Sequence, residues 1–219
     1  MSPQNASKHN FCEKKRLQKL TAIEKNIWRL GLKRIAGVDE AGRGPLAGPV
    51  VAAACIIPEG LFFEGINDSK LLSIKVRRSL FESLISHKEV VYGVGEVSHT
   101  VIDEINILQA TFLAMREAIF SLKEKPDYII VDGVKIPGIV NQNIIKGDQK
   151  SQSIAAASII AKCRRDELMV GWHEKYPEYG FDQHKGYGTP QHMAALKKHG
   201  PSPIHRRSFA PLHSTPEVR

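Results

Sequence analysis

The sequence predicts an α/β domain followed by a basic, loop-rich C-terminal arm. Two observations support this fold class: short apolar stretches of strand length alternate with longer segments whose apolar residues recur at helical spacing. At 219 residues the chain can bury a substantial core and fits one domain with appendages. We divide it into a basic N-terminal tail with a short helix (1–33), a central domain (34–199) and a basic C-terminal arm (200–219).

The N-terminal part combines a basic tail with a short helix. Thr21 and Glu24 have the Ser/Thr-x-x-Glu spacing of a capping box, which predicts a helix with Ile23, Ile27 and Leu30 on its apolar side. Two strands rich in Val, Ile and Ala are predicted next, at 34–39 and 49–57.

Helices and strands alternate through the rest of the chain. The predicted order is a helix over 73–88, a strand at 90–97, a helix near 105–122, strands at 128–131 and 142–146, a long helix beginning near Ser153 and a last helix over 191–199. The helical segments present regularly spaced apolar residues: Leu72, Val76, Leu80 and Leu84 in the first, and Leu108, Phe112, Met115 and Ile119 in the second. The small residues 155–158 of the long helix suit close packing on a sheet.

The overall charge favours a polyanionic partner. The chain has 31 Lys and Arg against 23 Asp and Glu, a formal net charge of +8. Its cysteines, Cys12, Cys55 and Cys163, lie far apart without a CxxC pair, which predicts neither a disulfide framework nor a zinc knuckle. No stretch has the apolar character of a signal peptide or a membrane span. We therefore expect a cytoplasmic protein with no membrane segment.

The segment from Gly37 to Pro45 is the most informative in the chain. Adjacent carboxylates, Asp39 and Glu40, stand where an apolar strand should end, and Arg43 follows between two glycines, Gly42 and Gly44. Neighbouring strand residues point to opposite faces, so the two carboxylates can share a site only if the strand ends or bulges there. Paired carboxylates beside a basic residue recur in metal-dependent phosphoryl transfer. The alternative is a turn with solvated charges.

Two further aspartates occupy positions where α/β proteins commonly place functional groups. Asp132 is the last residue of an apolar strand, although Asp-Gly is also a common turn pair. Asp148 follows Gly147 and precedes the long helix, where a role at a helix N-terminus explains it equally well. Neither residue identifies a function by itself.

Together with other motifs, these residues resemble the type 2 ribonuclease H family, specifically its ribonuclease HII group. The resemblance extends from about Arg34 to Pro211 and rests on seven segments in order: 37–45, 67–70 (Asn-Asp-Ser-Lys), 131–133, 146–148, 153–162, 184–189 (His-Lys-Gly-Tyr-Gly-Thr) and 205–209 (His-Arg-Arg-Ser-Phe). It implies a ribonuclease H-like fold, with a mixed central sheet flanked by helices. It also implies that Asp39, Glu40, Asp132 and Asp148 are catalytic residues and the ligands of Mn²⁺ or Mg²⁺.

The glycine-flanked Arg43 indicates the subgroup. The related ribonuclease HIII pattern has threonine there and usually an extra N-terminal domain, for which residues 1–33 are too short. Similarity to the HII group implies that Gly42, Arg43 and Gly44 bind a ribose 2′-hydroxyl, the group that distinguishes RNA from DNA. It also implies that Tyr187 stacks near the junction between ribonucleotide and deoxyribonucleotide. The alternative for Tyr187 is an ordinary aromatic packed in a glycine-rich loop.

Other polar residues are candidates for phosphate contacts. Ser69 and Lys70 would supply a hydroxyl and an ammonium group, although a helix cap before 73–88 is an alternative role. Arg206 and Arg207 would line the path of the duplex, although a single basic residue is more often just solvated. Four histidines, His184, His192, His199 and His205, lack a compact metal-ligand spacing.

The resemblance implies a monomeric endoribonuclease that uses two metal ions. It would hydrolyse the RNA strand of RNA/DNA hybrids and cut on the 5′ side of single ribonucleotides embedded in duplex DNA, leaving 3′-hydroxyl and 5′-phosphate ends, as ribonucleotide excision repair requires. Two alternatives stay open: a non-catalytic, basic nucleic-acid binding module, and a different ribonuclease H-like nuclease. Four carboxylates near phosphates would weaken simple binding, which favours the enzyme. The Gly-Arg-Gly and Gly-Tyr-Gly segments disfavour the second alternative.

Overall fold

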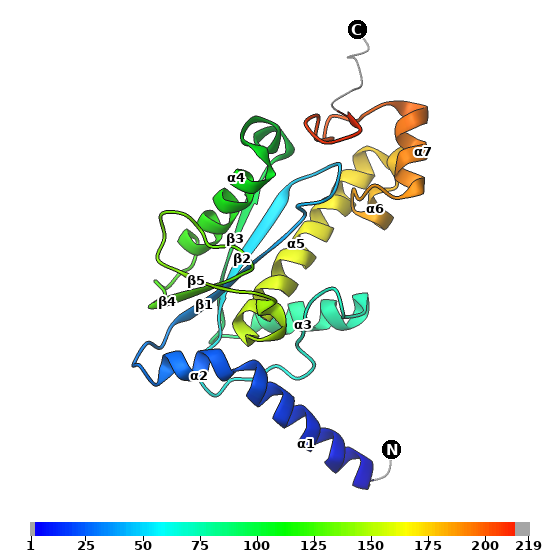
Figure 1. Cartoon of the computed structure of the whole chain (residues 1–219). Coiled ribbons are helices and arrows are strands. Elements are labelled where there is room, and N and C mark those ends of the chain that lie inside the picture. The colour runs from blue at the N-terminus through cyan, green and yellow to red at the C-terminus, as the bar shows by residue number, and fades with distance from the viewer. Residues whose placement is uncertain (1–2, 213–219) are drawn as a thin grey trace.

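A five-stranded mixed sheet forms the centre of the structure, a computed structural model that describes residues 3–212 and, over 3–11, the helical backbone only (Figure 1). Its strands are β1 (Ile35–Ala41), β2 (Val50–Ile56), β3 (Val91–Val97), β4 (Tyr128–Asp132) and β5 (Gln142–Ile144), in the spatial order β3-β2-β1-β4-β5. β1 runs antiparallel to β2 and parallel to β4. The mixed α/β architecture expected from the sequence is confirmed.

Helices cover both faces of the sheet. α5 (Gln152–Lys175) and α3 (Ile74–Ser86) lie on one face, and α4 (His99–Phe120) lies on the other (Figure 1). Successive residues of β2 serve the two cores in turn, since Ala53 and Cys55 pack toward α5 whereas Ala52 and Ala54 pack toward α4. The remaining elements are α1 (Pro3–Leu20), α2 (Ala22–Trp28), α6 (Phe181–His184), α7 (Pro190–His199) and the 3₁₀ turns η1 (Gly147–Gln149) and η2 (Pro177–Tyr179).

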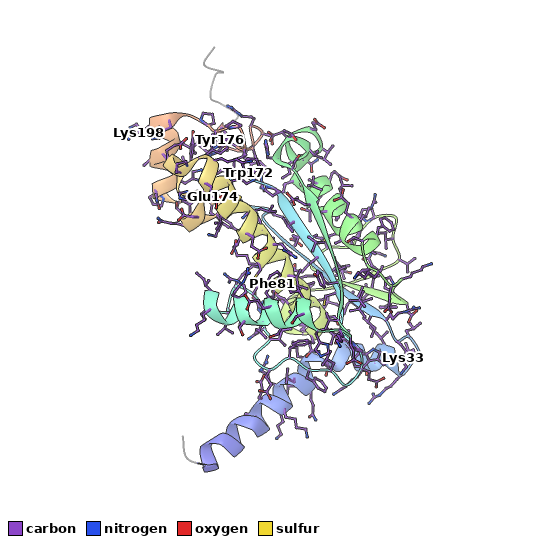
Figure 2. All side chains as sticks on the ribbon, turned by 180° about the vertical axis from the view of Figure 1, so that it is seen from behind. Lys33, Phe81, Trp172, Glu174, Tyr176 and Lys198 are labelled. Atoms are coloured by element: carbon purple, nitrogen blue, oxygen red, sulfur yellow. The ribbon has the colours of Figure 1, made fainter. Side chains whose placement is uncertain are left out.

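The α5 helix packs very closely on the sheet. A Cβ atom at Gly37 of β1 would overlap the backbone of Ser153 and Ile154, so only glycine fits there. The alanines at 155–157 are fully buried, as their small size predicted. Farther along, Phe81 of α3 is buried against α5, and Trp172 stacks on Tyr176 with ring centroids 6.2 Å apart (Figure 2). The contact of Gly37 with the backbone of Ser153 and Ile154 sets the distance between β1 and the start of α5.

The N-terminal segment differs from the expected tail. Residues 3–20 form helix α1, and Leu17 and Leu20 are buried in the core shared with α3. The predicted capping box is also wrong, because the Thr21 hydroxyl donates to the Leu17 carbonyl over 2.9 Å and caps nothing. Glu24 instead accepts from the Ser151 hydroxyl (2.6 Å) and the Ser153 N–H (3.1 Å), so it joins α2 to the N-terminus of α5.

Several local expectations need smaller corrections. α4 begins earlier than predicted and contains a kink at Asn106, whose φ is 67°; the predicted segment 105–122 corresponds to the part after the kink. Leu30, Val76 and Leu108, expected on apolar faces, are 76%, 44% and 39% exposed. Residues 213–219 of the predicted C-terminal arm lie outside the described residues. Within 3–212, no helix is both long and apolar enough to span a membrane.

Candidate active site

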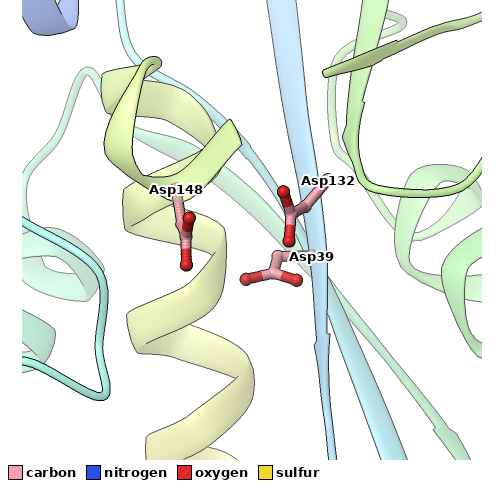
Figure 3. A group of neighbouring side chains, drawn as sticks. All are labelled: Asp39, Asp132 and Asp148. Carbon is pink, nitrogen blue, oxygen red and sulfur yellow. The ribbon is translucent and has the colours of Figure 1, made fainter. Parts of the chain in front are cut away.

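Three carboxylates from distant parts of the chain converge near the C-terminal ends of the inner strands β1 and β4. Asp39 belongs to β1, Asp132 ends the neighbouring parallel strand β4, and Asp148 lies in η1 just before α5 (Figure 3). Each offers an oxygen atom within 4.8 Å of the others. Asp39 and Asp148 are each only 4% exposed, whereas Asp132 is partly exposed, so the cluster is open to solvent on the Asp132 side.

The backbone around η1 fixes two of these carboxylates relative to each other. The Gly147 N–H donates to Asp132 Oδ1 over 2.6 Å, which ties the end of β4 to the turn that carries Asp148. A Cβ at Gly147 would lie 2.6 Å from Ile154 Cδ1 and 3.3 Å from Asp132 Oδ1, so a side chain there would require the ends of these two side chains to shift. The Ser151 hydroxyl then caps α5 by accepting from the Ile154 N–H (3.1 Å).

The aspartates sit in an electrostatically unfavourable arrangement. Burial, followed by repulsion from Glu40 and Asp132, raises the pKa of Asp39 well above its usual range. Burial together with repulsion from Asp68 and Asp132 raises the pKa of Asp148 to about 6. Lys70 is a nearby cation: burial opposes its charge, but Asp39, Asp68 and the other carboxylates outweigh burial and raise its pKa. An all-oxygen donor set under mutual repulsion fits hard divalent cations.

Glu40 is not one of the three carboxylates whose oxygens lie within 4.8 Å of one another. β1 continues to Ala41 in regular register, with Asp39 opposite Ala53 and Glu40 opposite Ala52, so the two carboxylates point to opposite faces. The expected bulge is absent within β1. The Glu40 carboxylate instead accepts from Arg43 Nη1 over 3.3 Å. Burial raises the pKa of Glu40, Arg43 opposes this rise, and repulsion from Asp132 adds to it, so Glu40 still interacts with the cluster. Its role as a metal ligand stays a prediction.

The segment around Ser69 contacts the carboxylates from the α3 side. Ser69 is 3% exposed and its hydroxyl lies 2.8 Å from that of Ser158 in α5, a residue that the sequence did not single out. The cap of α3 is Ser73, which accepts from the Val76 N–H, so the alternative cap role of Ser69 is wrong. The Lys70 N–H donates to Asp68 Oδ1 over 2.9 Å, which holds Lys70 at the edge of the site.

The two glycine-rich segments lie side by side. A Cβ at Gly44 would lie 3.8 Å from Tyr187 Cε1, in ordinary van der Waals contact. The Leu46 N–H donates to the Gly186 carbonyl over 2.8 Å, which links the two loops. Tyr187 is 42% exposed, so its ring has a face open to solvent instead of packing in a core. The residues expected at the ribose junction are thus neighbours in space.

The two neighbouring arginines of the C-terminal arm have different environments. Arg206 is fully buried and donates to main-chain carbonyls, so its guanidinium cannot contact a phosphate and that predicted role is wrong. Arg207 is exposed, and its N–H donates to Asp103 Oδ2 over 2.8 Å. Arg165 of α5 is equally buried, and nothing in its helical context distinguished it from the half-exposed Arg164 beside it.

Three of the four histidines gather behind the Tyr187 loop, although their sequence spacing gave no signal. His205 Nδ1 accepts from the Ser202 N–H (2.9 Å), so the proton of neutral His205 is on Nε2, which lies 2.9 Å from His192 Nε2. His192 in turn donates from Nδ1 to the Tyr187 carbonyl (3.0 Å). Burial lowers the pKa of His205 to about 3 and also lowers that of His192. His184 stacks on His192 with centroids 4.4 Å apart.

Similar proteins share both the fold and most of the chain. The family model for ribonuclease HII matches residues 36–212. The ribonuclease HII of Chlamydia muridarum is 59% identical over 201 residues, covering 89% of this chain and 93% of the relative. That of Chlamydia trachomatis serovar A is 61% identical over 183 residues, covering 83% and 84%.

Solved structures agree with these matches. Ribonuclease H2 from Pyrococcus horikoshii superimposes with a TM-score of 0.68 at 33% identity, covering 82% of this chain and 95% of that chain. Ribonuclease HII of Archaeoglobus fulgidus, solved in complex with PCNA, gives 0.67 at 28% identity, covering 80% and 95%. The matches set aside a non-catalytic binding module and other ribonuclease H-like nucleases. The chain therefore belongs to the ribonuclease HII family of metal-dependent endonucleases, which hydrolyse RNA in RNA/DNA hybrids.

Proposed function

We propose that the chain cuts RNA/DNA hybrids and single ribonucleotides embedded in duplex DNA with two Mg²⁺ or Mn²⁺ ions held by Asp39, Asp132 and Asp148. The observation that carries this proposal is the convergence of three carboxylate oxygens within 4.8 Å of one another. Ions held there would supply an activated water and would stabilise the charge on the leaving 3′-oxygen. Carboxylate oxygens suit both metals, so the donor set does not choose between them.

The side chains around the cluster would hold the phosphate in place. Lys70 carries a positive charge next to the aspartates, where it can balance a phosphate oxygen. Arg43 is 42% exposed at its side chain and already pairs with Glu40, which fixes its direction at the edge of the site. Glu40 thus supports the site by orienting Arg43 in this proposal. The Ser69 hydroxyl forms a hydrogen bond with that of Ser158, so in this proposal Ser69 supports the site through the packing of α5.

The neighbouring glycine loops support recognition of the ribose junction. Gly44 brings the backbone of its loop against Tyr187, so one nucleotide can contact the loop while the next stacks on the exposed ring. The 2′-hydroxyl accepts as well as donates hydrogen bonds, so it can accept from the backbone N–H groups of this loop beside Arg43. Cleavage on the 5′ side of that ribonucleotide would leave 3′-hydroxyl and 5′-phosphate ends.

We propose that this activity serves to remove ribonucleotides from DNA. In this proposal the protein acts in the cytoplasm as a monomer. The three cysteines are free, as a reducing compartment favours. The exposed Arg207 lies on the same C-terminal segment as Arg206, whose guanidinium holds the Gly42–Arg43 loop, and it can contact a phosphate of the duplex.

The deciding experiment uses duplex DNA with one ribonucleotide at a defined position. The protein is incubated with this duplex and Mg²⁺, Mn²⁺ or a chelator, with an all-DNA duplex of the same sequence as the control. We expect one cut, on the 5′ side of the ribonucleotide, only with metal and only in the ribonucleotide duplex. A cut on the 3′ side, or activity confined to continuous hybrids, would contradict the proposal.

A further inference from the structure

Two buried arginines lie directly beneath the proposed junction-binding loops. Arg165 and Arg206 are each 0% exposed, and neither has a carboxylate within ion-pair distance among the side chains described, those of residues 12–212. Burial lowers the pKa of Arg165 to about 10 and that of Arg206 to about 9, so both stay charged at neutral pH. Buried charges without ionic partners are costly, and they persist only where many hydrogen bonds satisfy them.

Main-chain carbonyls provide those hydrogen bonds. Arg206 donates from Nε to Gly48 (2.9 Å), from Nη1 to Arg43 (3.0 Å) and from Nη2 to Gly42 (2.6 Å) and Pro49 (3.1 Å). Two of these four acceptors belong to the Gly42–Arg43–Gly44 loop itself. The guanidinium of Arg206 therefore fixes the carbonyl direction of the residues proposed to face the 2′-hydroxyl.

Arg165 connects the same loop to the loop of Tyr187. It donates from Nε to Pro49 (3.0 Å), from Nη2 to Ala47 (3.1 Å) and from Nη1 to Lys185 (2.9 Å), two residues before Tyr187. A Cβ at Gly42 would overlap the Arg165 side chain, so the loop rests directly on it. The Arg165 guanidinium carbon also lies 5.8 Å from the centroid of the Tyr187 ring.

We propose that Arg165 and Arg206 are positioning residues that hold the Gly42–Arg43–Gly44 loop and the Tyr187 loop at one fixed separation. They act through the main chain and touch no substrate. A fixed separation lets both loops engage the two sides of a single ribose–deoxyribose junction in one register. The inference rests on the proposed function, because it concerns the substrate that offers only one such junction.

The planar fork of arginine is essential to this role. Arg206 reaches four carbonyls that diverge around it, whereas a lysine ammonium has three donors at one point and cannot span them. Lysine nevertheless keeps the positive charge. An Arg→Lys substitution at either position thus separates fixed loop geometry from charge alone.

The test compares Arg206→Lys, Arg206→Met and Arg165→Lys on a duplex with one embedded ribonucleotide and on a continuous RNA/DNA hybrid. Arg164→Lys is the matched control, because Arg164 is half-exposed and pairs with Glu167 instead. For all three test variants we expect kcat on the embedded ribonucleotide to fall on the order of tenfold to a hundredfold more than kcat on the hybrid. The salt dependence of KM should stay unchanged, since neither guanidinium meets a phosphate.

The outcomes separate this inference from the proposed function. Circular dichroism and active-site titration correct for misfolded protein, which would lower both activities equally. If the Lys variants do not fold, Phe209→Leu decides, because it removes only the ring 5.0 Å from the Arg206 guanidinium carbon and should shift the same ratio more weakly. The positioning role alone would be overturned if all three variants kept the wild-type ratio of kcat on the embedded ribonucleotide to kcat on the hybrid. It would also be overturned if Arg206→Lys kept this ratio while Arg206→Met lowered it. A wild-type protein that leaves the embedded ribonucleotide uncut would overturn the proposed function and this inference together.

Discussion

Asp132 has two functions that a single substitution can separate. One oxygen of its carboxylate accepts from the Gly147 N–H and holds η1 in place, while the charge faces Asp39 and Asp148. Asparagine keeps an oxygen acceptor of the same shape but removes the charge. The carboxylate is thus a structural link as well as a metal ligand in our proposal.

We predict that Asp132→Asn abolishes cleavage while the fold and most of the affinity for the duplex remain. Loss of one charged ligand disturbs ion placement without opening a cavity. The measurements are circular dichroism, duplex binding and product formation. Added Mg²⁺ or Mn²⁺ should raise the melting temperature of the wild type and have much less effect on the variant. Near-normal turnover in Asp132→Asn would refute the ligand assignment.

Tyr187 should matter most where the substrate offers one 2′-hydroxyl in one register. Tyr187→Ala is expected to lower cleavage at a single embedded ribonucleotide more than cleavage of a continuous hybrid, because the hybrid offers many registers. Tyr187→Phe is the matched control, since it keeps the ring and should retain the wild-type preference. Equal losses on both substrates in Tyr187→Ala would reduce the ring to a packing role.

At the scale of elements, the contact between β1 and α5 sets the spacing of the aspartates. Asp39 lies two residues after Gly37 in β1, and Asp148 lies in the turn that leads into α5. Gly37 meets the backbone of Ser153 and Ile154, and neither backbone can yield without moving a whole element. The proposed metal site therefore depends on a position that carries no side chain.

Gly37→Ala should destabilise the protein by about 3 kcal/mol and reduce activity even at temperatures where the variant is folded, because the new methyl group pushes α5 away from β1. Gly60→Ala is a less specific comparison: it lies in open space but has a φ of 91°, so it measures backbone strain without the clash. Denaturant unfolding and turnover at low temperature test the prediction. A Gly37→Ala variant with wild-type stability would mean that β1 and α5 are less tightly packed than described.

The strands were predictable from the sequence, whereas contacts between elements were not. Apolar stretches located β1 to β4 to within a few residues, because a buried strand needs an apolar run, whereas β5 (Gln142–Ile144) is short, partly polar and largely exposed. The spacing of Thr21 and Glu24 was misleading, because Glu24 accepts from the Ser153 N–H at the N-terminus of α5 and not from an N–H of its own helix. A helix was missed at 3–20 because its buried face consists of few residues, such as Leu17 and Leu20, among many charged ones.

The same limit applies to the active site. Asp39 and Asp132 could be found because each lies at the end of an apolar stretch, but the sequence could not show whether β1 continues regularly past Asp39, which the register does show. Arg206 was expected at the surface because arginine usually is exposed. Its burial depends on carbonyls of a loop that lies more than 150 residues away in the chain. Arg165 likewise depends on that loop, which lies more than 110 residues away from it.

For the whole molecule, the buried histidines make stability depend on pH. The pKa of His205 is about 3 in the folded protein against an ordinary value of 6.5. Below pH 6.5 the unfolded chain therefore binds a proton that the folded protein does not, and stability falls as pH decreases toward 3, by up to ~1.4 kcal/mol per pH unit for one group. Groups with raised pKa values, such as Glu24, act in the opposite direction.

A comparison of variants isolates the histidine contribution. Between pH 7 and pH 5, the melting temperature of His205→Gln should fall less steeply than that of the wild type, because the opposing carboxyl groups are present in both proteins. His199→Gln, on an exposed histidine of the same region, should keep the wild-type slope. Parallel slopes in all three proteins would show that His205 is not held neutral.

The wide separation of the site residues along the chain has a consequence for synthesis. Asp39, Asp132 and Asp148 meet only after β4, η1 and the start of α5 have been made, and the loop at Gly42 is held by Arg206 near the end of the described chain. A growing chain thus carries most of its sequence before it can assemble a nuclease centre.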